Sequence, residues 1–147
     1  MNTIYFYFED YQYIELHTDL LKRKIVDLIV NESKKVGELS VIFCSDNYLL
    51  NVNRKYLKHD YYTDIVTFDY SEEEVCSGDL FISLDRVKEN AHNFKCEFLQ
   101  EVYRVVFHGI LHLWGYNDKL EDEKKQIRAK EDYYLEGVDF SISDYEN

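Results

Sequence analysis

Two histidines are the residues of this chain whose type and spacing most directly suggest metal chemistry. His108 and His112 stand four positions apart in the stretch HGILHLWGYND. On a helix, such side chains share one face, with Cβ atoms roughly 5–6 Å apart. Both imidazoles can then reach a single zinc ion at about 2.0–2.1 Å. The spacing alone leaves a second interpretation open, in which both are partly buried structural histidines.

A third ligand is available a few residues further on. Gly115 is expected to end the helix just after His112, and the residues that follow turn the chain back, which can bring Asp118 near the two imidazoles. Two histidines and one carboxylate leave the fourth tetrahedral position of zinc open, as in catalytic zinc sites. The alternative is that Asp118 caps the last helix, one or two residues before it.

Gly109 excludes one well-known use of paired histidines. In the metalloprotease motif HExxH, the residue after the first histidine is a glutamate that acts as general base. Glycine stands there in this chain, so that proteolytic machinery is absent. The missing side chain leaves room either for a bulky substrate or for close backbone packing.

The elements that must position these residues follow from hydrophobic periodicity and from turn signals. Strands are expected at 4–8, 38–45, 63–70 and 79–83. Helices are expected at 18–36, 46–56, 84–94, 97–114 and 120–135, with Gly37 ending the first. This order predicts one α+β domain over residues 1–147, with helices packed on a four-stranded, mostly mixed sheet. The metal site falls on a C-terminal helix and the following turn, and residues 138–147 are interpreted as an acidic tail.

Two further carboxylates lie at the edges of predicted strands. Asp64 and Asp79 could support metal ligands from a second layer, or they could be ordinary turn residues. The sequence leaves both interpretations open.

The amino-acid composition limits the classes of protein to which this chain can belong. The chain has 147 residues, 46% of them hydrophobic and 31% charged, as in a soluble globular domain. It has no apolar run of roughly 18 residues, and its first residues do not resemble a signal peptide. The three cysteines, Cys44, Cys76 and Cys96, form no CxxC pair, which favours small buried side chains in a reducing cytosol over disulfides or a cysteine-rich zinc site. We therefore expect a cytoplasmic protein.

The net charge of −12 argues against general nucleic-acid binding, because phosphate binding is driven by lysine and arginine. Contact with RNA would need a local basic patch. One candidate is the segment that contains Arg54, Lys55, Lys58 and His59. The alternative is that this segment is only a solvated helix face.

Three blocks of the sequence follow one another in the order and at the spacing of a known family. HGILHLWGYND is similar to the pattern His-Gly-x-Leu-His-Leu-x-Gly-Tyr-Asp-His. In LLNVNRKYLKHDYYTDIVTF the matching residues are Asn53, Tyr56, Asp60, Thr63, Asp64 and Phe68. The third block is GDLFIS, at 78–83. Together these blocks cover about half of the chain and resemble the YbeY family of single-domain, metal-dependent endoribonucleases, also called rRNA maturation factors.

The chain departs from the family pattern at two positions. The third zinc ligand of the family is usually a histidine, and the matching residue here is Asp118, whose anionic oxygen would acidify a bound water less strongly. The family commonly has an arginine directed at the active-site cleft where this chain has Leu57. A positive charge that holds phosphate must therefore come from elsewhere.

The resemblance implies a zinc-dependent, single-strand-specific endoribonuclease that acts in rRNA maturation, at the 3′ end of 16S rRNA, and in ribosome biogenesis and quality control. One zinc ion per chain, held by His108, His112 and Asp118, would polarise a phosphodiester oxygen, activate a water, or both. No residue of the signature stands out as a general base. The expected partners are rRNA and the small ribosomal subunit, with ribosomal proteins and a ribosome-associated GTPase as further candidates. We expect a monomer without a membrane association.

A second hypothesis comes from a different class. The protein could be a metal-stabilised ribosome-assembly factor with little nuclease activity of its own. The acidic net charge and Leu57 favour this alternative, since an acidic surface can dock on basic ribosomal proteins.

Overall fold

A computed structural model describes residues 3–141 and contains one four-stranded sheet. The strands are β1 (Ile4–Glu9), β2 (Lys35–Cys44), β3 (Ile65–Asp69) and β4 (Val75–Ser83). Their order across the sheet is β1-β2-β4-β3. β2 is parallel to both β1 and β4, whereas β3 is antiparallel to β4. The sheet is therefore mixed, as predicted.

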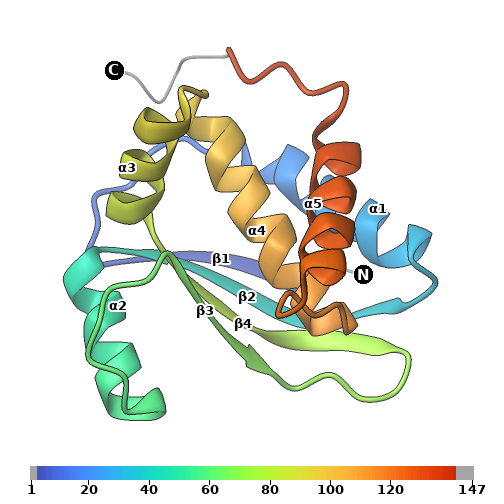
Figure 1. Cartoon of the computed structure of the whole chain (residues 1–147), viewed down its shortest axis with the longest axis horizontal. Coiled ribbons are helices and arrows are strands. Elements are labelled where there is room, and N and C mark those ends of the chain that lie inside the picture. Colours follow the sequence, from blue (N-terminus) through green and yellow to red (C-terminus); the bar gives the residue numbers. More distant parts are fainter. Residues whose placement is uncertain (1–2, 142–147) are drawn as a thin grey trace.

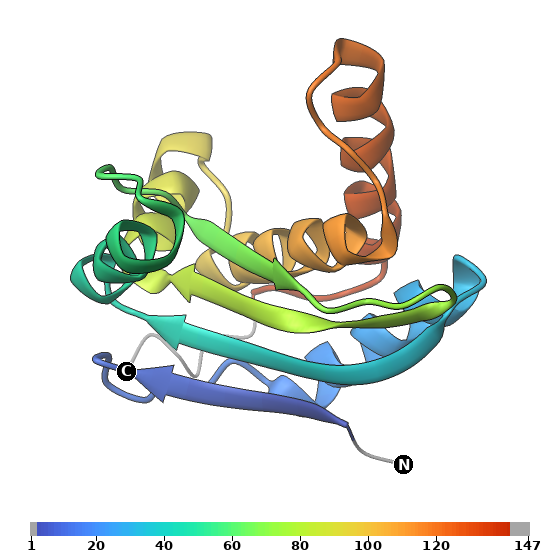
Figure 2. The same cartoon turned by 90° about the horizontal axis from the view of Figure 1, so that it is seen from below.

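Five α-helices accompany this sheet within the described residues. They are α1 (Thr18–Asn31), α2 (Asp46–Val52), α3 (Leu84–Phe94), α4 (Phe98–Trp114) and α5 (Glu121–Leu135). A single π-helical turn, η1 (Asn53–Leu57), continues α2. Helices α1, α3, α4 and α5 lie over one face of the sheet, and α2 lies near the carboxyl end of β2 (Figures 1 and 2). The α+β class predicted from the element order is confirmed.

Helix α4 is the central helix of the core. Its apolar stripe is buried against the sheet and the neighbouring helices, and it includes Leu99, Val102, Val106, Ile110 and Leu113. Gly109 sits where α4 crosses closest to the sheet. A Cβ there would lie 2.7 Å from the Ile65 side chain and closer still to Leu80. Of the two uses open to this glycine, the structure therefore shows close packing rather than space for a substrate.

The end of the first helix is wrong in the sequence-based prediction. α1 stops at Asn31 rather than near position 36, and Ser33 takes a left-handed backbone conformation in the turn that follows. β2 begins at Lys35, and the Lys35 N–H donates to the Glu74 carbonyl. Gly37 lies inside β2, beside a register shift, where a Cβ would collide with Ser77. Its role is close strand packing and not helix termination.

Two other boundaries also differ. β4 starts at Val75 rather than at the predicted position 79, because Val75 pairs with Lys35 of β2. The predicted acidic tail at 138–147 is not wholly detached from the domain: Phe140 is buried and packs edge-on against Tyr103 at 5.4 Å. Residues 142–147 of that tail lie outside the described residues.

The three cysteines are free, with Cys44 and Cys76 buried, as expected from their spacing. Among residues 3–141, no helix combines the length and the hydrophobicity that a bilayer crossing requires.

The close approach at Gly109 generates a stability prediction. Gly109→Ala gains roughly 1 kcal/mol of helix propensity but forces Ile65 and Leu80 to move, at a cost of about 1–3 kcal/mol. The difference is an expected net loss of up to about 2 kcal/mol in the free energy of unfolding, measured by urea denaturation. Asn93→Ala, at an exposed position of α3, is the control and should not destabilise the protein. A Gly109→Ala variant more stable than wild type would contradict the close approach.

Candidate metal centre

The two histidines lie on one face of α4, and Asp118 lies in the turn between α4 and α5. Gly115 closes α4 with a positive φ of 125°, and its N–H bonds to carbonyls of the last helical turn. The cap of α5 is Leu120 and not Asp118, so the alternative role of Asp118 as a helix cap is not observed. His108, His112 and Asp118 form a group that could hold a metal ion.

The three donor atoms have the spacing that a metal would impose. His108 Nε2 lies 3.0 Å from His112 Nε2. Asp118 Oδ2 lies 3.2 Å from the first nitrogen and 3.3 Å from the second. A tetrahedron built from zinc–ligand bonds of about 2.0–2.1 Å has edges of about 3.3 Å. The three atoms therefore fit three corners of such a tetrahedron, and one corner is left for another ligand.

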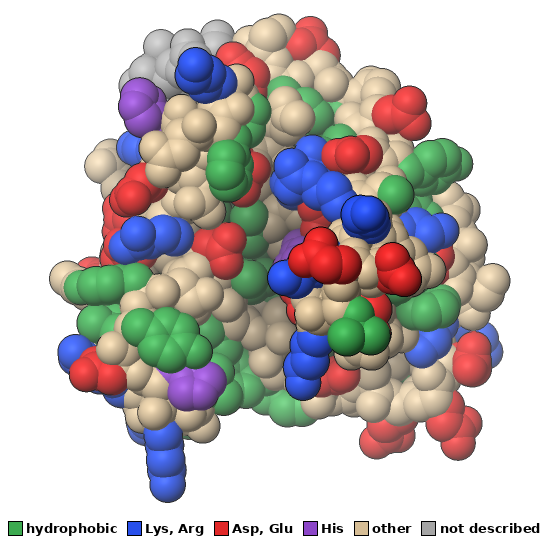
Figure 3. Space-filling model, viewed as in Figure 1, with side chains coloured by type: hydrophobic (Ala, Val, Ile, Leu, Met, Phe, Trp, Pro, Cys, Tyr) green, Lys and Arg blue, Asp and Glu red, His purple; other side chains and the backbone are tan. Residues whose placement is uncertain are grey.

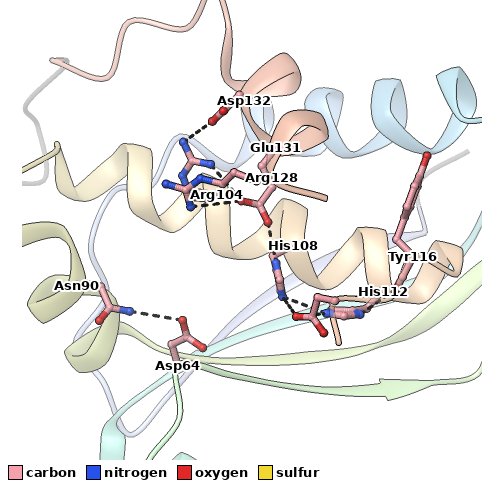
Figure 4. A network of polar contacts seen from close by, with 10 residues as sticks. Asp64, Asn90, Arg104, His108, His112, Tyr116, Arg128, Glu131 and Asp132 are labelled. Atoms are coloured by element: carbon pink, nitrogen blue, oxygen red, sulfur yellow. Dashed lines mark hydrogen bonds and ion pairs between the residues drawn. The ribbon is translucent and has the colours of Figure 1, made fainter. Parts of the chain in front are cut away.

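The opposite nitrogen of each imidazole meets a hydrogen-bond acceptor (Figure 4). His108 Nδ1 lies 2.7 Å from Glu131 Oε2, and His112 Nδ1 lies 3.0 Å from the Tyr116 carbonyl oxygen. These acceptors favour the tautomer with hydrogen on Nδ1 and a lone pair on Nε2. Both lone pairs then point at the same place as the Asp118 carboxylate. Lone pairs that converge in this way repel one another when nothing lies between them. A cation bound between them turns the arrangement into a favourable one.

Glu131 is held in turn by a second set of contacts. Its side chain is buried, and its other oxygen, Oε1, accepts a hydrogen bond from Arg104 Nη1 at 3.0 Å. Arg104 also donates through Nη2 to Asp132 at 2.8 Å. A buried carboxylate needs such a charged partner. The chain Arg104–Glu131–His108 thus connects α4 and α5 and fixes the orientation of one imidazole.

The other imidazole is held through the turn. The Tyr116 hydroxyl donates to Glu32 at 2.8 Å, and Glu32 also accepts hydrogen bonds from the Tyr134 hydroxyl at 2.7 Å and from Lys130 at 3.1 Å. Burial acts to raise the pKa of Glu32, but these three donors outweigh it and hold the pKa below its ordinary value. Glu32 is therefore a carboxylate that ties the turn to α1 and α5, and the turn supplies the carbonyl that orients His112.

Acidic neighbours make the position of His108 favourable for positive charge. Burial acts to lower the pKa of His108. The hydrogen bond that His108 donates to Glu131 and the nearby charges of Glu131, Asp118 and Asp64 outweigh burial and raise the pKa above its ordinary value. The same carboxylates would stabilise a bound cation.

A cavity of about 200 Å³ adjoins His108. Its walls come from α3, α4, α5 and the segment before β3, and include Asp64, Asn90, Glu101 and Arg128. Figure 3 shows the surface hollowed between α3 and α5, with basic side chains over α5 along one rim. Figure 4 shows Asp64 and Asn90 across from His108. Asn90 Nδ2 donates a hydrogen bond of 3.4 Å to Asp64 Oδ2. Asp64 thus faces the centre, which favours a supporting role over that of an ordinary turn residue.

Glu101 is the most unusual side chain of this cavity. It is only 4% exposed, yet its one side-chain hydrogen bond among the described residues comes from the Cys96 thiol, at 4.0 Å. Burial raises the pKa of Glu101 to about 7, and repulsion by Asp64 adds to the effect, whereas Arg104 opposes it. The folded protein therefore binds a proton at Glu101 more tightly than the unfolded chain does.

The predicted RNA-binding residues lie on η1 and the loop after it, on the surface. Arg54 forms an ion pair with Asp60, Lys55 lies over the Tyr56 ring, and His59 stacks on Tyr61. Lys58 is exposed in a left-handed backbone conformation. The walls of the cavity beside His108 do not include any of these four basic residues. RNA binding by this segment stays a prediction.

The carboxylates Glu131 and Glu101 were missed by the sequence analysis, although each left a signal. Glu131 interrupts the apolar face of α5 formed by Ile127, Tyr134 and Leu135, and Glu101 interrupts the stripe of α4. A charged residue on a buried helical face needs a partner or a function. Which residue it would meet depends on how α4 and α5 pack, and the periodicity of either helix does not contain that information.

Fold and centre together define a small α+β protein with a two-histidine, one-carboxylate candidate metal centre at the end of its central helix. Comparison with known proteins identifies a family within this class. A family profile described as Endoribonuclease YbeY matches residues 7–139. This chain belongs to the endoribonuclease YbeY family.

Individual relatives support the assignment. The chain is 42% identical over 129 residues to an Endoribonuclease YbeY of Azobacteroides pseudotrichonymphae, covering 88% of this chain and 93% of the relative. It is 48% identical over 134 residues to one from Cytophaga hutchinsonii, covering 90% and 94%. A solution structure of a Thermotoga maritima protein is similar with a TM-score of 0.68 and 30% identity, covering 90% of this chain and 87% of that one.

The first prediction from this geometry concerns Glu131. Glu131→Gln keeps the shape of the side chain but removes the charge that orients and polarises His108. We expect the affinity for added Zn²⁺ to fall by about 10–100-fold, as for other acceptors behind metal-binding histidines. Competition with a chromogenic chelator measures it. Asp132→Asn is the matched control, because Asp132 contacts Arg104 but not His108; equal effects of the two changes would contradict the role given to Glu131.

The second prediction concerns the pH dependence of stability. The pKa of Glu101 is about 7 in the folded protein against an ordinary value of 4.5, so the folded state holds the proton more tightly. This contribution to stability is fully present below pH 4.5 and is lost as the pH rises through 7. Glu101→Gln should therefore raise the free energy of unfolding by up to about 3 kcal/mol at pH 8 and by little near pH 4.5. Urea denaturation at both pH values measures the difference, and a pH-independent effect would contradict it.

Proposed function

We propose that this protein is a zinc-dependent, single-strand-specific endoribonuclease that acts in rRNA maturation, at the 3′ end of 16S rRNA, and in ribosome quality control. The observation that carries the proposal is the convergence of His108 Nε2, His112 Nε2 and Asp118 Oδ2 beside a cavity. The name of the family, Endoribonuclease YbeY, supports the choice of RNA as substrate.

Zinc fits the donor set best. Two imidazole nitrogens and one carboxylate oxygen are ligands that zinc commonly takes, and the spacing of the three donors matches its tetrahedral geometry. Magnesium would prefer an octahedral set of oxygens. When bound, zinc supplies Lewis acidity that polarises a phosphodiester oxygen and lowers the pKa of water. We propose one zinc ion per chain.

The protein side chains have their own tasks in this proposal. Glu131 and the Tyr116 carbonyl keep the two imidazoles in the required tautomer and orientation. Phosphate groups on either side of the reacting bond need positive charge. Arg54, Lys55, Lys58 and His59 remain candidates for the backbone outside the cleft, since all four are exposed. Leu57, where the resemblance leads one to expect an arginine, offers no charge.

The cellular setting is proposed on the same grounds. We propose the cytoplasm as the location and the small ribosomal subunit as the partner that presents the RNA, with ribosomal proteins and a ribosome-associated GTPase as further partners. The net charge of −12 supports docking on basic ribosomal proteins. A monomer is the proposed form.

The rival function is a metal-stabilised ribosome-assembly factor with little nuclease activity. The same acidic surface favours it. Cleavage of a defined single-stranded RNA by highly purified protein distinguishes the two functions. The nuclease should lose activity on chelation and regain it with Zn²⁺. Cleavage that survives His108→Ala would come from a contaminating nuclease.

The ligand assignment leads to a direct prediction. His112→Ala and Asp118→Ala each remove one of three ligands, so bound zinc should fall well below one per chain. RNA cleavage should fall by more than about 100-fold, since loss of residues that merely support zinc ligands costs 10–100-fold. Metal analysis and a gel-based cleavage assay provide the measurements. His92→Ala, at an exposed position on α3, is the control, and full zinc content in both ligand variants would show that the assignment is wrong.

A further inference from the structure

The cavity beside His108 is too small for a stretch of RNA and of a suitable size for one ring system. Its volume is about 200 Å³, below the roughly 300–1,000 Å³ of pockets for drug-sized ligands. It lies between α3, α4 and α5, next to the candidate metal centre. Any ligand that fills it would therefore place its attached groups close to His108.

Three carboxyl groups, those of Asp64, Glu101 and Glu131, line this cavity together with the basic side chains of Arg104, Arg128 and His108. Glu101 is 4% exposed and receives only the distant thiol hydrogen bond from Cys96 among the described residues. Arg104 attracts the Glu101 carboxylate through its charge but is not among its hydrogen-bond donors, because Arg104 donates to Glu131 at 3.0 Å and to Asp132 at 2.8 Å. A buried carboxyl group without a good donor is costly. The cavity is thus complementary to a ligand that brings N–H groups to Glu101.

The same carboxylates determine which part of an RNA can enter. A phosphate group would be repelled by Glu101 and by Asp64, whereas a neutral base would not. Single-stranded RNA is commonly recognised through bases that are turned out, stacked on aromatic rings and hydrogen-bonded on their edges. Phe94 lines the cavity with a ring that is 61% exposed, and it is free to stack.

Guanine is the base that matches this arrangement best. Its N1–H and its exocyclic amino group point in the same direction, so one carboxylate can accept both hydrogen bonds. Uracil presents one such N–H between two carbonyl oxygens, which a carboxylate repels. Hydrogen bonds to charged groups are stronger than neutral ones. Glu101 therefore favours guanine over uracil.

One basic side chain at the rim of the cavity, Arg128, can bind the phosphate group that such a nucleotide carries. Arg128 lines the cavity, its side chain is 58% exposed, and its closest acidic contact is Glu131 at 3.8 Å. The Arg128 guanidinium is therefore more accessible to a ligand than that of Arg104, whose side chain is only 11% exposed. A phosphate held by Arg128 would lie at the exposed rim, away from the buried carboxyl group of Glu101.

We propose that this cavity binds one unpaired guanine nucleotide of the RNA, with Glu101 accepting hydrogen bonds from the base edge, Phe94 stacking on the base and Arg128 contacting its phosphate. The inference rests on the proposed nuclease function, since it names the base that this function would select. It also accounts for the proposed preference for single strands, because a paired guanine already uses its N1–H and its amino group in the base pair.

The test compares mononucleotides that share a phosphate. Zinc-loaded, full-length protein is titrated calorimetrically with GMP, IMP and UMP. GMP should bind at least about tenfold more tightly than UMP, with IMP, which lacks the amino group, in between. Glu101→Gln should abolish the preference by weakening GMP binding, and it should not weaken UMP binding, because it removes the repulsion of the uracil oxygens. Glu97→Gln, on an exposed residue one turn earlier, should keep the preference.

Two further variants test the other contacts. Phe94→Ala should weaken GMP and UMP alike, and Arg128→Ala should weaken both nucleotides but not guanosine. Equal binding of GMP and UMP by the wild type, or a preference that survives Glu101→Gln, would overturn the proposal. So would tight binding of spermidine without a preference for GMP, since it would assign the cavity to a cationic ligand.

These outcomes are separable from the nuclease proposal, because binding is measured without cleavage. A protein that prefers GMP but leaves RNA intact would retain the guanine site and lose the proposed nuclease function. A protein that cleaves RNA without a preference for GMP would show the reverse.

Discussion

The close contact of α4 with the sheet is the constraint on which the candidate centre depends. Gly109 lets the helix approach Ile65 and Leu80 within a distance that a methyl group would prevent. With that face of the helix buried, His108 and His112 are directed to the side, where α5 and the turn before it lie. The two candidate histidine ligands are therefore positioned by apolar packing, and the polar contacts set the orientation of the imidazole rings.

Those polar contacts divide into two separate chains of hydrogen bonds. One runs from Arg104 through Glu131 to His108, and the other runs from Glu32 through the Tyr116 turn to His112. Each contains one carboxylate that is largely buried, Glu131 in the first and Glu32 in the second. Because the two chains come from different elements, a change in one imidazole need not disturb the other. Asp118, in contrast, relies on the turn alone and is more exposed, so it is the ligand most able to adjust.

The charge of the molecule also becomes easier to understand. A net charge of −12 is unfavourable for an RNA-binding protein, and acidic groups even line the cavity beside the centre. In our account the carboxyl group of Glu101 binds a base and that of Asp118 binds a cation. Neither of them contacts a phosphate. Positive charge is then needed only at the rim, where Arg128 lies.

Local sequence predicted the parts of the structure that depend on local spacing. The two histidines, the helix stop at Gly115 and the return of Asp118 are all contained within one short stretch, and they were predicted correctly as neighbours. Gly37 was misinterpreted as a helix end, because its close contact with Ser77 comes from a strand far along the chain. Glu131 and Glu101 were missed for the same reason: their partners are set by the packing of α4 against α5.

The measurement that tests the central claim most directly is anomalous diffraction at the zinc absorption edge from crystals of the protein grown with Zn²⁺. Our account predicts one strong peak per chain, about 2.0–2.1 Å from His108 Nε2, His112 Nε2 and a carboxylate oxygen of Asp118, with one position left for a further ligand. A peak bound by other residues, or the absence of any peak at these three side chains, would contradict it.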